Sequence, residues 1–261
     1  MLFIVLPAYN EEQGISPLLD KIQRAMAAFQ YQVLVVNDGS TDGTAAAVNS
    51  YSGSIPLELL DHGVNKGLGQ AITTGLRRAV ELASNDDIVV TMDADNTHDP
   101  ALIGDMVKGI QQCLDLVIAS RYAPGGGEIG LSWMRHVFSR GASLLLRLFF
   151  PMEGVRDYTC GYRAYRGAIL KRAFATYQDR FIEESGFTCM AEILIKLRRL
   201  SVRAGEVPLV LRYDLKSGAT KMKVTRTIGR YGVLIAKNWL RQVNRCRSEG
   251  KQDEGGMARP R

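Results

Sequence analysis

The chain has 261 residues, of which 46% are hydrophobic, and a formal net charge of +6 at pH 7. This length and apolar content suit one large α/β domain with a core of its own, and they exclude a chain that is disordered throughout. The positive charge favours anionic partners, which include nucleic acid, membrane surfaces and phosphorylated small molecules.

Cysteine and histidine spacing predicts neither a disulfide framework nor a zinc site. The four cysteines, at 113, 160, 189 and 246, include no C-x-x-C pair, and the three histidines, at 62, 98 and 136, lack zinc spacing. We therefore expect a reduced, cytoplasmic protein. The most apolar stretch, 141–151, contains Arg147 and is shorter than the roughly 20 residues that a spanning helix needs, so we expect no transmembrane segment.

In the first half of the chain, short apolar runs alternate with helical patterns. The runs, which we interpret as buried strands, lie at 2–6, 32–36, 57–60, 87–92 and 114–119, and the helical patterns at about 11–29, 41–50, 67–83 and 99–112. This alternation predicts an α/β fold with a doubly wound, mostly parallel sheet. Because ligands bind such sheets at the carboxyl ends of the strands, polar clusters that follow the strands should meet at one edge.

The second half of the chain has a different pattern. A Gly-rich loop at 124–130 precedes an amphipathic or apolar helix near 131–149, and short mixed elements continue to about 213. Residues 221–247 contain eight Lys or Arg and no Asp or Glu, with apolar residues at helical spacing. We therefore divide the chain into a main domain at 1–220, a basic amphipathic helical segment at 221–247 and a disordered tail at 248–261.

Two carboxylates, Asp93 and Asp95, follow the strand predicted at 87–92. At this spacing beyond a strand, both can turn toward one hard cation such as Mg²⁺ or Mn²⁺. Asp-x-Asp is also common as a helix cap or an Asx turn, here ahead of Pro100. The position directly after a buried strand favours the metal site.

Polar residues also follow the first two predicted strands. Ser40, Thr41 and Asp42 are typical of a helix cap, whereas Asp38 ends its strand and can accept hydrogen bonds from a base or ribose. Glu11 has two interpretations, a ligand contact or a first-turn charge that the helix dipole favours.

Four motifs occur in order along this half of the chain: Pro7-Ala8-Tyr9-Asn10-Glu11, Asn37-Asp38-Gly39-Ser40, Asn65-Lys66-Gly67 and Asp93-Ala94-Asp95. The series resembles the inverting family 2 glycosyltransferases of the GT-A fold. Later segments are similar to dolichyl-phosphate mannosyltransferases and their bacterial polyprenyl-phosphate relatives, namely Ser120-Arg121-Tyr122, Trp133 with Arg135, Asp157-Tyr158-Thr159-Cys160-Gly161-Tyr162-Arg163 and Gly218-Ala219-Thr220-Lys221. The resemblance covers about residues 1–225.

The resemblance implies roles for individual residues. The residues that it implies for donor binding are Pro7, Tyr9, Glu11, Asp38, Lys66, Asp93 and Ala94. Those that it implies for metal binding and catalysis are Asp93 and Asp95. Family members often carry Gln two positions after the second Asp, where this chain has Thr97, so we place Thr97 in the metal shell with Asn96 or His98 as substitutes. The residues that the resemblance implies for binding the acceptor phosphate are Arg121, Arg135, Ser139 and Lys221.

The predicted reaction follows from this resemblance. A hexose, in the first place mannose from GDP-mannose, moves with inversion onto a polyprenyl or dolichyl phosphate, and Mg²⁺ or Mn²⁺ assists. A phosphate monoester is mostly dianionic at pH 7, so such an acceptor needs cations rather than a general base. The alternatives are a UDP-glucose donor, a soluble or glycan acceptor, and a non-enzymatic regulatory subunit with the GT-A fold.

Other classes fit the sequence less well. A nucleotidyltransferase usually has a Gly-rich phosphate loop after the first strand, where this chain has Pro7 to Glu11. A dehydrogenase is disfavoured because no G-x-G-x-x-G follows that strand. A nucleic-acid partner is not expected, because the cations cluster late in the chain beside apolar residues.

The helix near 131–149 and the basic segment at 221–247 predict attachment to a membrane surface. Leucines and aromatic residues with interspersed arginines suit interfacial insertion, and the basic segment adds attraction to anionic lipid. The alternative for the apolar helix is core packing or a dimer contact, so a homo-oligomer stays open. We expect a cytoplasmic protein bound peripherally to the cytosolic face of a membrane.

Overall fold

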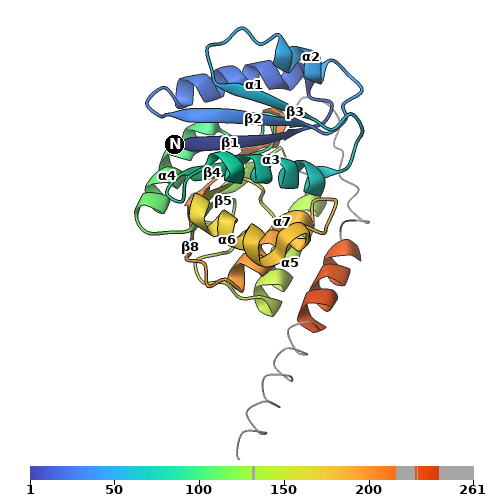
Figure 1. Ribbon diagram of the computed structural model, residues 1–261. Coiled ribbons are helices and arrows are strands. Elements are labelled where there is room, and N and C mark those ends of the chain that lie inside the picture. Colours follow the sequence, from blue (N-terminus) through green and yellow to red (C-terminus); the bar gives the residue numbers. More distant parts are fainter. Residues whose placement is uncertain (131–132, 216–226, 228, 241–261) are drawn as a thin grey trace, which may run out of the picture.

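The computed structural model describes residues 1–130, 133–215, 227 and 229–240, and its centre is a seven-stranded sheet (Figure 1). The strand order is β3-β2-β1-β4-β7-β5-β8. Neighbouring strands are parallel except β7, which runs antiparallel to β4 and β5. The strands are β1 (Leu2–Ala8), β2 (Tyr31–Asn37), β3 (Leu57–Asp61), β4 (Ile88–Thr91), β5 (Leu116–Ser120), β7 (Arg163–Arg166) and β8 (Ala204–Pro208). A separate parallel pair joins β6 (Gly127–Ile129) to β9 (Val210–Arg212).

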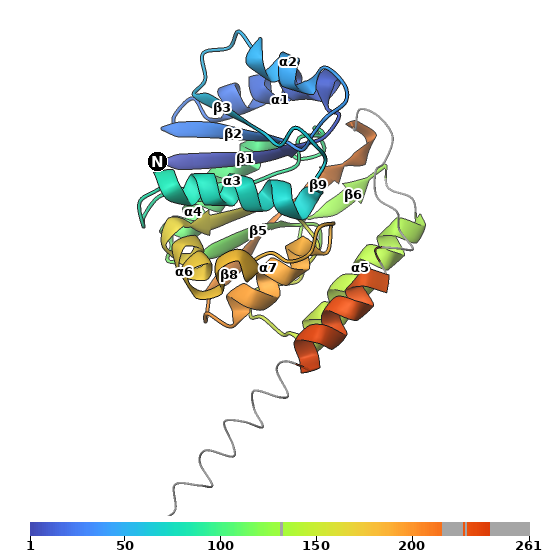
Figure 2. The same cartoon turned by 45° about the vertical axis from the view of Figure 1, so that its right-hand side comes forward.

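Helices cover the sheet. They are α1 (Glu12–Ala25), α2 (Thr44–Asn49), α3 (Leu68–Leu82), α4 (Ile103–Gln111), α5 (Trp133–Phe149), α6 (Gly167–Tyr177) and α7 (Cys189–Arg198), with short 3-10 turns η1 (Pro100–Leu102), η2 (Gln178–Arg180) and η3 (Tyr213–Leu215). Helix α3 packs on β1 and β2 and contacts α6 and α7. Residues 229–240 form a further helix, which lies beside α5 in Figure 2.

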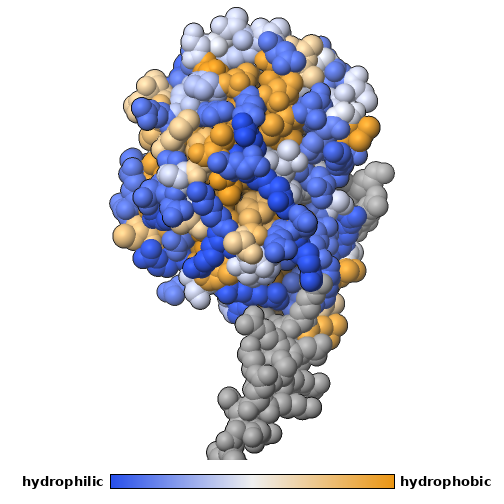
Figure 3. All heavy atoms as spheres, in the orientation of Figure 1, coloured by the Kyte–Doolittle hydropathy of each residue, from blue (hydrophilic) through white to orange (hydrophobic). Residues whose placement is uncertain are grey.

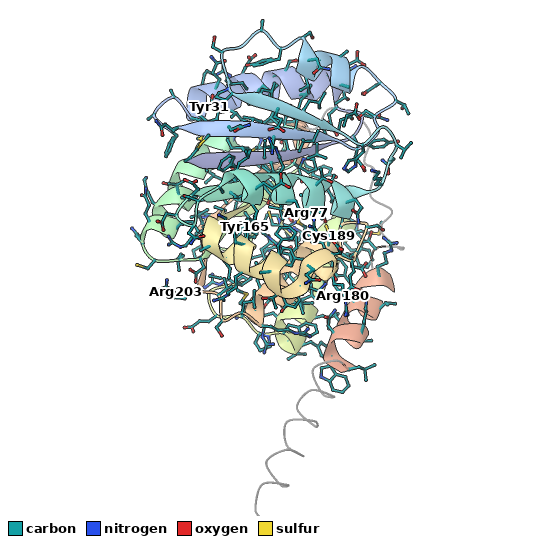
Figure 4. All side chains as sticks on the ribbon, in the orientation of Figure 1. Tyr31, Arg77, Tyr165, Arg180, Cys189 and Arg203 are labelled. Atoms are coloured by element: carbon teal, nitrogen blue, oxygen red, sulfur yellow. The ribbon has the colours of Figure 1, made fainter. Side chains whose placement is uncertain are left out.

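The core forms where the strands supply continuous apolar runs. Strand β1 buries both faces, as expected for a central parallel strand covered by helices, and Ile4, Val5 and Leu6 have no exposed surface. Each such side chain contributes about 1.5–3 kcal/mol through burial. In Figure 4, Tyr165 and Cys189 lie inside the molecule, whereas Arg180 and Arg203 lie on its outer side.

The structure confirms the predicted α/β class, the mostly parallel sheet and all five strands of the first half. One detail was wrong, because the strand predicted at 57–60 is β3, which lies at the sheet edge and is only half-buried. Strand β7 had no prediction of its own. It carries only four residues, too few to show a period.

The predicted helix near 131–149 is α5, which begins at Trp133 within the described residues. Of the basic segment at 221–247, residues 227 and 229–240 are helical. The remainder of that segment and the tail at 248–261 lie outside the described residues. Among the described helices, none combines the length and the apolar character that crossing a bilayer requires.

Candidate active site

One cavity of about 980 Å³ opens at the carboxyl ends of the central strands. The predicted donor and metal residues that line it are Pro7, Tyr9, Glu11, Asp38, Asp93, Ala94, Asp95 and Thr97. The prediction that the polar clusters meet at one edge of the sheet is therefore confirmed. Lys66 is not among the lining residues, and it is an exposed residue whose backbone N–H donates to Asp38 over 2.9 Å.

A tight turn after β4 presents the Asp95 carboxylate. The Oδ1 atom of Asp95 accepts hydrogen bonds from the backbone N–H of Thr97 over 3.2 Å and from the Thr97 hydroxyl over 2.6 Å. Asn96 takes a left-handed φ of 63° between them. The Asx turn that we weighed as an alternative is thus real, but it shapes the site, because Asp95 still lines the cavity. The cap ahead of Pro100 is Asp99, which accepts from the Ala101 N–H.

The two residues weighed as substitutes for the missing Gln have different surroundings. The amide of Asn96 faces α1, where its Nδ2 donates to the Gly14 carbonyl over 2.7 Å and its Oδ1 accepts from Lys21 Nζ over 3.1 Å. Asn96 is also not among the residues that line the cavity, so its position does not favour a role as a metal ligand. His98 stays in the cavity wall, and its Nδ1 accepts from the Asp93 N–H over 3.2 Å while its ring stacks on Tyr162.

The donor atoms fit a hard cation that completes its shell from substrate. Among the described residues, no group of three or more His, Cys, Asp or Glu side chains could hold a metal alone. Asp93 and Asp95 provide two carboxylates on one cavity. Mg²⁺ is usually bound in this way, through one or two carboxylates together with substrate phosphates and water. Burial raises the pKa of the Cys160 thiol to about 12, so this cavity residue supplies no thiolate at neutral pH.

Asp38 holds the loop that precedes α3. Its Oδ1 accepts from the Lys66 N–H over 2.9 Å and lies 2.8 Å from His62 Nδ1, and its Oδ2 accepts from the Gly67 N–H over 2.9 Å. The residue is 3% exposed and lines the cavity. Asp38 therefore has a structural role in the loop, and its contact with a nucleoside stays a prediction.

The 183–188 loop forms part of the cavity wall and lies against the start of α3. The carbonyl of Ser185 accepts from the Gly69 N–H over 3.0 Å. A Cβ atom on Gly69 would lie 1.8 Å from the carbonyl oxygen of Glu184, and one on Gly67 would lie 2.6 Å from that of Ser185. Gly67 also has a positive φ of 90°. Only glycine fits at these two positions, so the 183–188 loop and the loop before α3 are in direct backbone contact.

Arg121 is bound by protein carboxylates. Its guanidinium forms a bidentate pair with Asp157, with Nε to Oδ2 and Nη2 to Oδ1 both at 2.8 Å, and Nη1 donates to Glu128 over 2.9 Å. Nη2 also donates to the Thr159 hydroxyl. Glu128 in turn pairs with His136 of α5. Four of the five guanidinium hydrogens are therefore engaged within the protein, and the predicted contact of Arg121 with an acceptor phosphate stays a prediction.

The ion pair of Arg121 with Asp157 is almost fully buried, with side-chain exposures of 9% and 0%. Burial alone would raise the pKa of Asp157, but the charge and hydrogen bonds of Arg121 outweigh it and hold that pKa below its usual value. Burial likewise opposes the charge of Arg121, yet Asp157 holds its pKa well above the usual value. Both side chains are thus charged at neutral pH.

The other predicted acceptor residues lie on α5 or beyond it. Ser139 lines the cavity, and its hydroxyl accepts from the Tyr122 hydroxyl over 2.9 Å. The guanidinium groups of Arg121 and Arg140 both lie over the Tyr122 ring, 5.1 and 5.7 Å from its centroid. Arg135 lies in the first turn of α5, and Lys221 lies outside the described residues.

The cavity continues from the polar sheet edge to an apolar end between two helices. Its lining there comes from Val137, Phe138 and Leu145 of α5 and from Tyr231 and Ile235 of the 229–240 helix. Both helices also have exposed apolar side chains, namely Trp133, Met134, Val137, Phe138, Leu144, Leu145, Leu148, Phe149, Val233, Trp239 and Leu240. In Figure 3, apolar surface is visible at the lower right, where the 229–240 helix lies.

Sequence reasoning missed several residues of the site. It assigned no role to His62, Glu128 or the 183–188 loop, and it quoted Asp157 only within a motif. Asp157 and Glu128 could have been considered as partners of Arg121, because a protein that buries an arginine must place carboxylates beside it. Nothing local to residues 183–188 marks them as a cavity wall, because the loop that they contact at Gly69 lies more than 100 residues earlier in the chain.

The fold and the position of the site define a GT-A type of α/β protein. The structure matches that of glucosyl-3-phosphoglycerate synthase from Mycobacterium tuberculosis, solved in complex with Mn²⁺, uridine-diphosphate and glucosyl-3-phosphoglycerate, with a TM-score of 0.64. The match covers 92% of this chain and 78% of that one at 19% sequence identity, which shows the fold alone.

Residues 3–174 match the family Glycosyl transferase family 2, and the chain belongs to this family. It is therefore a glycosyltransferase, as the motif series predicted. Similar proteins include the polyprenol monophosphomannose synthase of Mycolicibacterium smegmatis, 33% identical over 84% of this chain and 80% of the relative. The undecaprenyl-phosphate mannosyltransferase of Micrococcus luteus is 32% identical over 84% and 86% of the two chains. The dolichol-phosphate mannosyltransferase of Pyrococcus furiosus is 29% identical, and this chain spans only 58% of its length.

Proposed function

We propose that this protein transfers a hexose, in the first place mannose from GDP-mannose, onto a polyprenyl or dolichyl phosphate with inversion. The observation that carries the proposal is that one cavity joins the Asp93 and Asp95 carboxylates to an apolar end between α5 and the 229–240 helix. Such a cavity suits a polar donor and a lipid acceptor that meet at its middle. The names of three relatives, all mannosyltransferases or a mannose synthase of polyprenyl-type phosphates, support the same choice.

The polar end holds the donor in this proposal. Pro7, Tyr9, Glu11 and Asp38 surround the nucleoside, and Asp93 and Asp95 lie at the diphosphate with Mg²⁺ or Mn²⁺. When bound, the cation neutralises charge that develops on the departing diphosphate. Thr97 contributes by holding the Asp95 carboxylate through its hydroxyl rather than by replacing Gln as a ligand.

The middle of the cavity holds the acceptor phosphate. A dianionic phosphate oxygen attacks the anomeric carbon without a general base, so the protein has to position the phosphate and to balance its charge. The charge of Arg121 is already balanced by Asp157 and Glu128. We therefore assign most of the attraction to Arg135 and Lys221, with Ser139 as a hydrogen-bonding partner.

Replacing Arg135 with alanine should impair lipid glycosylation more than donor hydrolysis. We expect the KM for the lipid phosphate to rise about 10-fold or more, the typical loss of one charge-assisted hydrogen bond, while the KM for the donor stays within twofold of the wild-type value. Steady-state kinetics with each substrate varied in turn would measure both. Equal losses in transfer and donor hydrolysis would contradict the acceptor role.

The apolar faces of α5 and the 229–240 helix attach the protein to the cytosolic face of a membrane in this proposal. Leu144 and Leu148, which are 67% and 73% exposed, lie four residues apart on α5. Replacing both with glutamine should weaken binding to vesicles that contain anionic lipid by at least about 100-fold, because each leucine contributes roughly 1.5–3 kcal/mol when buried. Vesicle co-sedimentation measures this.

The matched control is Leu82 on α3, whose change to glutamine should leave vesicle binding unaltered. Unchanged vesicle binding by the double variant would contradict the membrane role. If the wild type is instead a dimer by light scattering, and the double variant a monomer, the apolar face is a subunit contact.

The function itself is tested with purified protein, Mg²⁺ or Mn²⁺, a polyprenyl phosphate and a panel of labelled nucleotide sugars. Label from GDP-mannose should enter the organic phase. Label from UDP-glucose alone would change the donor but keep the lipid acceptor. No lipid product from any donor would overturn the lipid acceptor and favour a soluble or glycan acceptor.

A further inference from the structure

His62 lies outside the predicted site, yet its backbone and its side chain both bind the end of β2. It is the first residue after β3, and its N–H donates to the Asn37 carbonyl over 3.0 Å. Its Nδ1 lies 2.8 Å from Asp38 Oδ1, and its Nε2 lies 2.9 Å from the Thr74 hydroxyl of α3. The side chains of His62 and Asp38 are only 6% and 5% exposed. Because an ionised carboxylate only accepts, His62 Nδ1 carries the hydrogen in this contact.

The hydrogen bonds of Asp38 limit what it can offer to a ligand. An ionised carboxylate has about four acceptor positions. Among the described residues, three are taken, by His62, by the Lys66 N–H and by the Gly67 N–H. One position therefore remains on a residue that lines the cavity. A negative group with one open acceptor position suits an N–H or O–H donor, as on a nucleobase or a ribose, and repels a phosphate.

We propose that His62 is a positioning residue for the nucleoside end of the donor site. Its ring links Oδ1 of Asp38 to the Thr74 hydroxyl of α3 and so, together with the two backbone N–H donors, fixes the rotation of the carboxylate. The open position on Oδ2 then serves a base N–H or a ribose hydroxyl. This inference rests on the proposed function, since it assumes a nucleotide donor in this cavity. The new element is the role of His62, because the proposed function already places Asp38 at the nucleoside.

The alternative is that the contact between His62 and Asp38 only fastens a turn. A purely structural contact would affect stability and would weaken every ligand of the cavity alike. A positioning role predicts a selective loss. The two interpretations therefore differ in whether a diphosphate without a nucleoside also binds less tightly.

The test compares two probes, GDP or UDP with Mg²⁺ and inorganic pyrophosphate with Mg²⁺, by isothermal titration calorimetry. His62→Leu removes both hydrogen bonds and should weaken nucleotide binding about 10-fold, with pyrophosphate binding unchanged. His62→Asn keeps an N–H close to the place of Nδ1 and should restore binding to within about threefold of wild type. In turnover, the KM for the donor should rise, while kcat and the KM for the acceptor stay constant.

Thr74→Val removes only the second partner of His62 and should give a smaller loss with the same selectivity. Its matched control is Thr176→Val on α6, which also removes a hydroxyl hydrogen bond but lies in another helix. If His62→Leu does not fold, Thr74→Val and His62→Asn decide the matter.

Equal losses for nucleotide and pyrophosphate, normal nucleotide binding in His62→Leu, or no rescue by asparagine would each overturn the role of His62. If the wild type transfers sugar and the His62→Leu variant has an unchanged KM for the donor, only the role of His62 is contradicted. A wild-type protein that binds neither nucleotide contradicts the proposed function and the role of His62 together.

Discussion

Replacing Asp95 with asparagine should lower sugar transfer by at least about 100-fold, the typical cost of losing one group that stabilises charge in a transition state. Asparagine keeps the shape and can still accept the hydrogen bonds from the N–H and hydroxyl of Thr97, so the turn after β4 should survive. What is lost is the negative charge that a divalent cation needs. Transfer assays across a range of Mg²⁺ and Mn²⁺ concentrations, with circular dichroism to confirm folding, measure the effect.

A control for this variant lies four residues further along the chain. Asp99 is exposed and caps η1 by accepting from the Ala101 N–H, and it does not line the cavity. Because asparagine also caps helices well, Asp99→Asn should keep activity within about twofold of wild type. Full activity in Asp95→Asn would remove this carboxylate from the metal site and from the reaction.

Replacing Asp157 with asparagine should destabilise the protein by about 3–5 kcal/mol, the usual result of removing one partner of a buried ion pair. Asp157 is fully buried and accepts from Arg121 and from the N–H groups of Thr159 and Cys160. Urea denaturation at pH 7 would measure the change. The matched control is Asp179→Asn, which removes an ion pair with Arg77 whose side chains are 97% and 41% exposed, and should cost less than about 1 kcal/mol.

The effect of Asp157→Asn should also depend on pH in a defined direction. The pKa of Asp157 is lowered in the folded protein, whereas an unfolded aspartate has a pKa of about 3.9. A lowered pKa gives stability that is present above the unfolded value and lost as pH falls through the folded value. The difference between wild type and variant should therefore narrow below about pH 4. A constant difference from pH 7 to pH 3 would contradict the ionised pair.

The sequence predicted the fold of the first half well because local pattern and tertiary structure agree there. Apolar runs such as 2–6 and 32–36 are long enough to identify buried strands, and the residues that follow them lie in one cavity by geometric necessity. Strand β3 was placed correctly, but its half-exposed state depends on its position at the sheet edge, which no local pattern records.

The sequence predicted which residues make up the candidate site, but not which of their side chains contact one another. Asp93 and Asp95 were found because they follow a strand, yet nothing in the spacing shows that Asn96 faces α1 while Thr97 binds Asp95. Arg121 was assigned to a phosphate from the resemblance. Its engagement by Asp157, 36 residues later, depends on the antiparallel insertion of β7, which was not predicted.

The need for glycine at positions 67 and 69 limits which substitutions this enzyme can accept. Since the backbone of Glu184 and Ser185 occupies the space where a Cβ would lie, neither position can take even alanine unless the opposite loop moves as well. A substitution on one side must therefore be accompanied by a shift on the other. In a library of variants, positions 67 and 69 should tolerate almost nothing singly, and any tolerated replacement should carry a second change in the 183–188 loop. Changes at positions 67 and 69 are thus expected to evolve in pairs with changes in the 183–188 loop rather than through single steps.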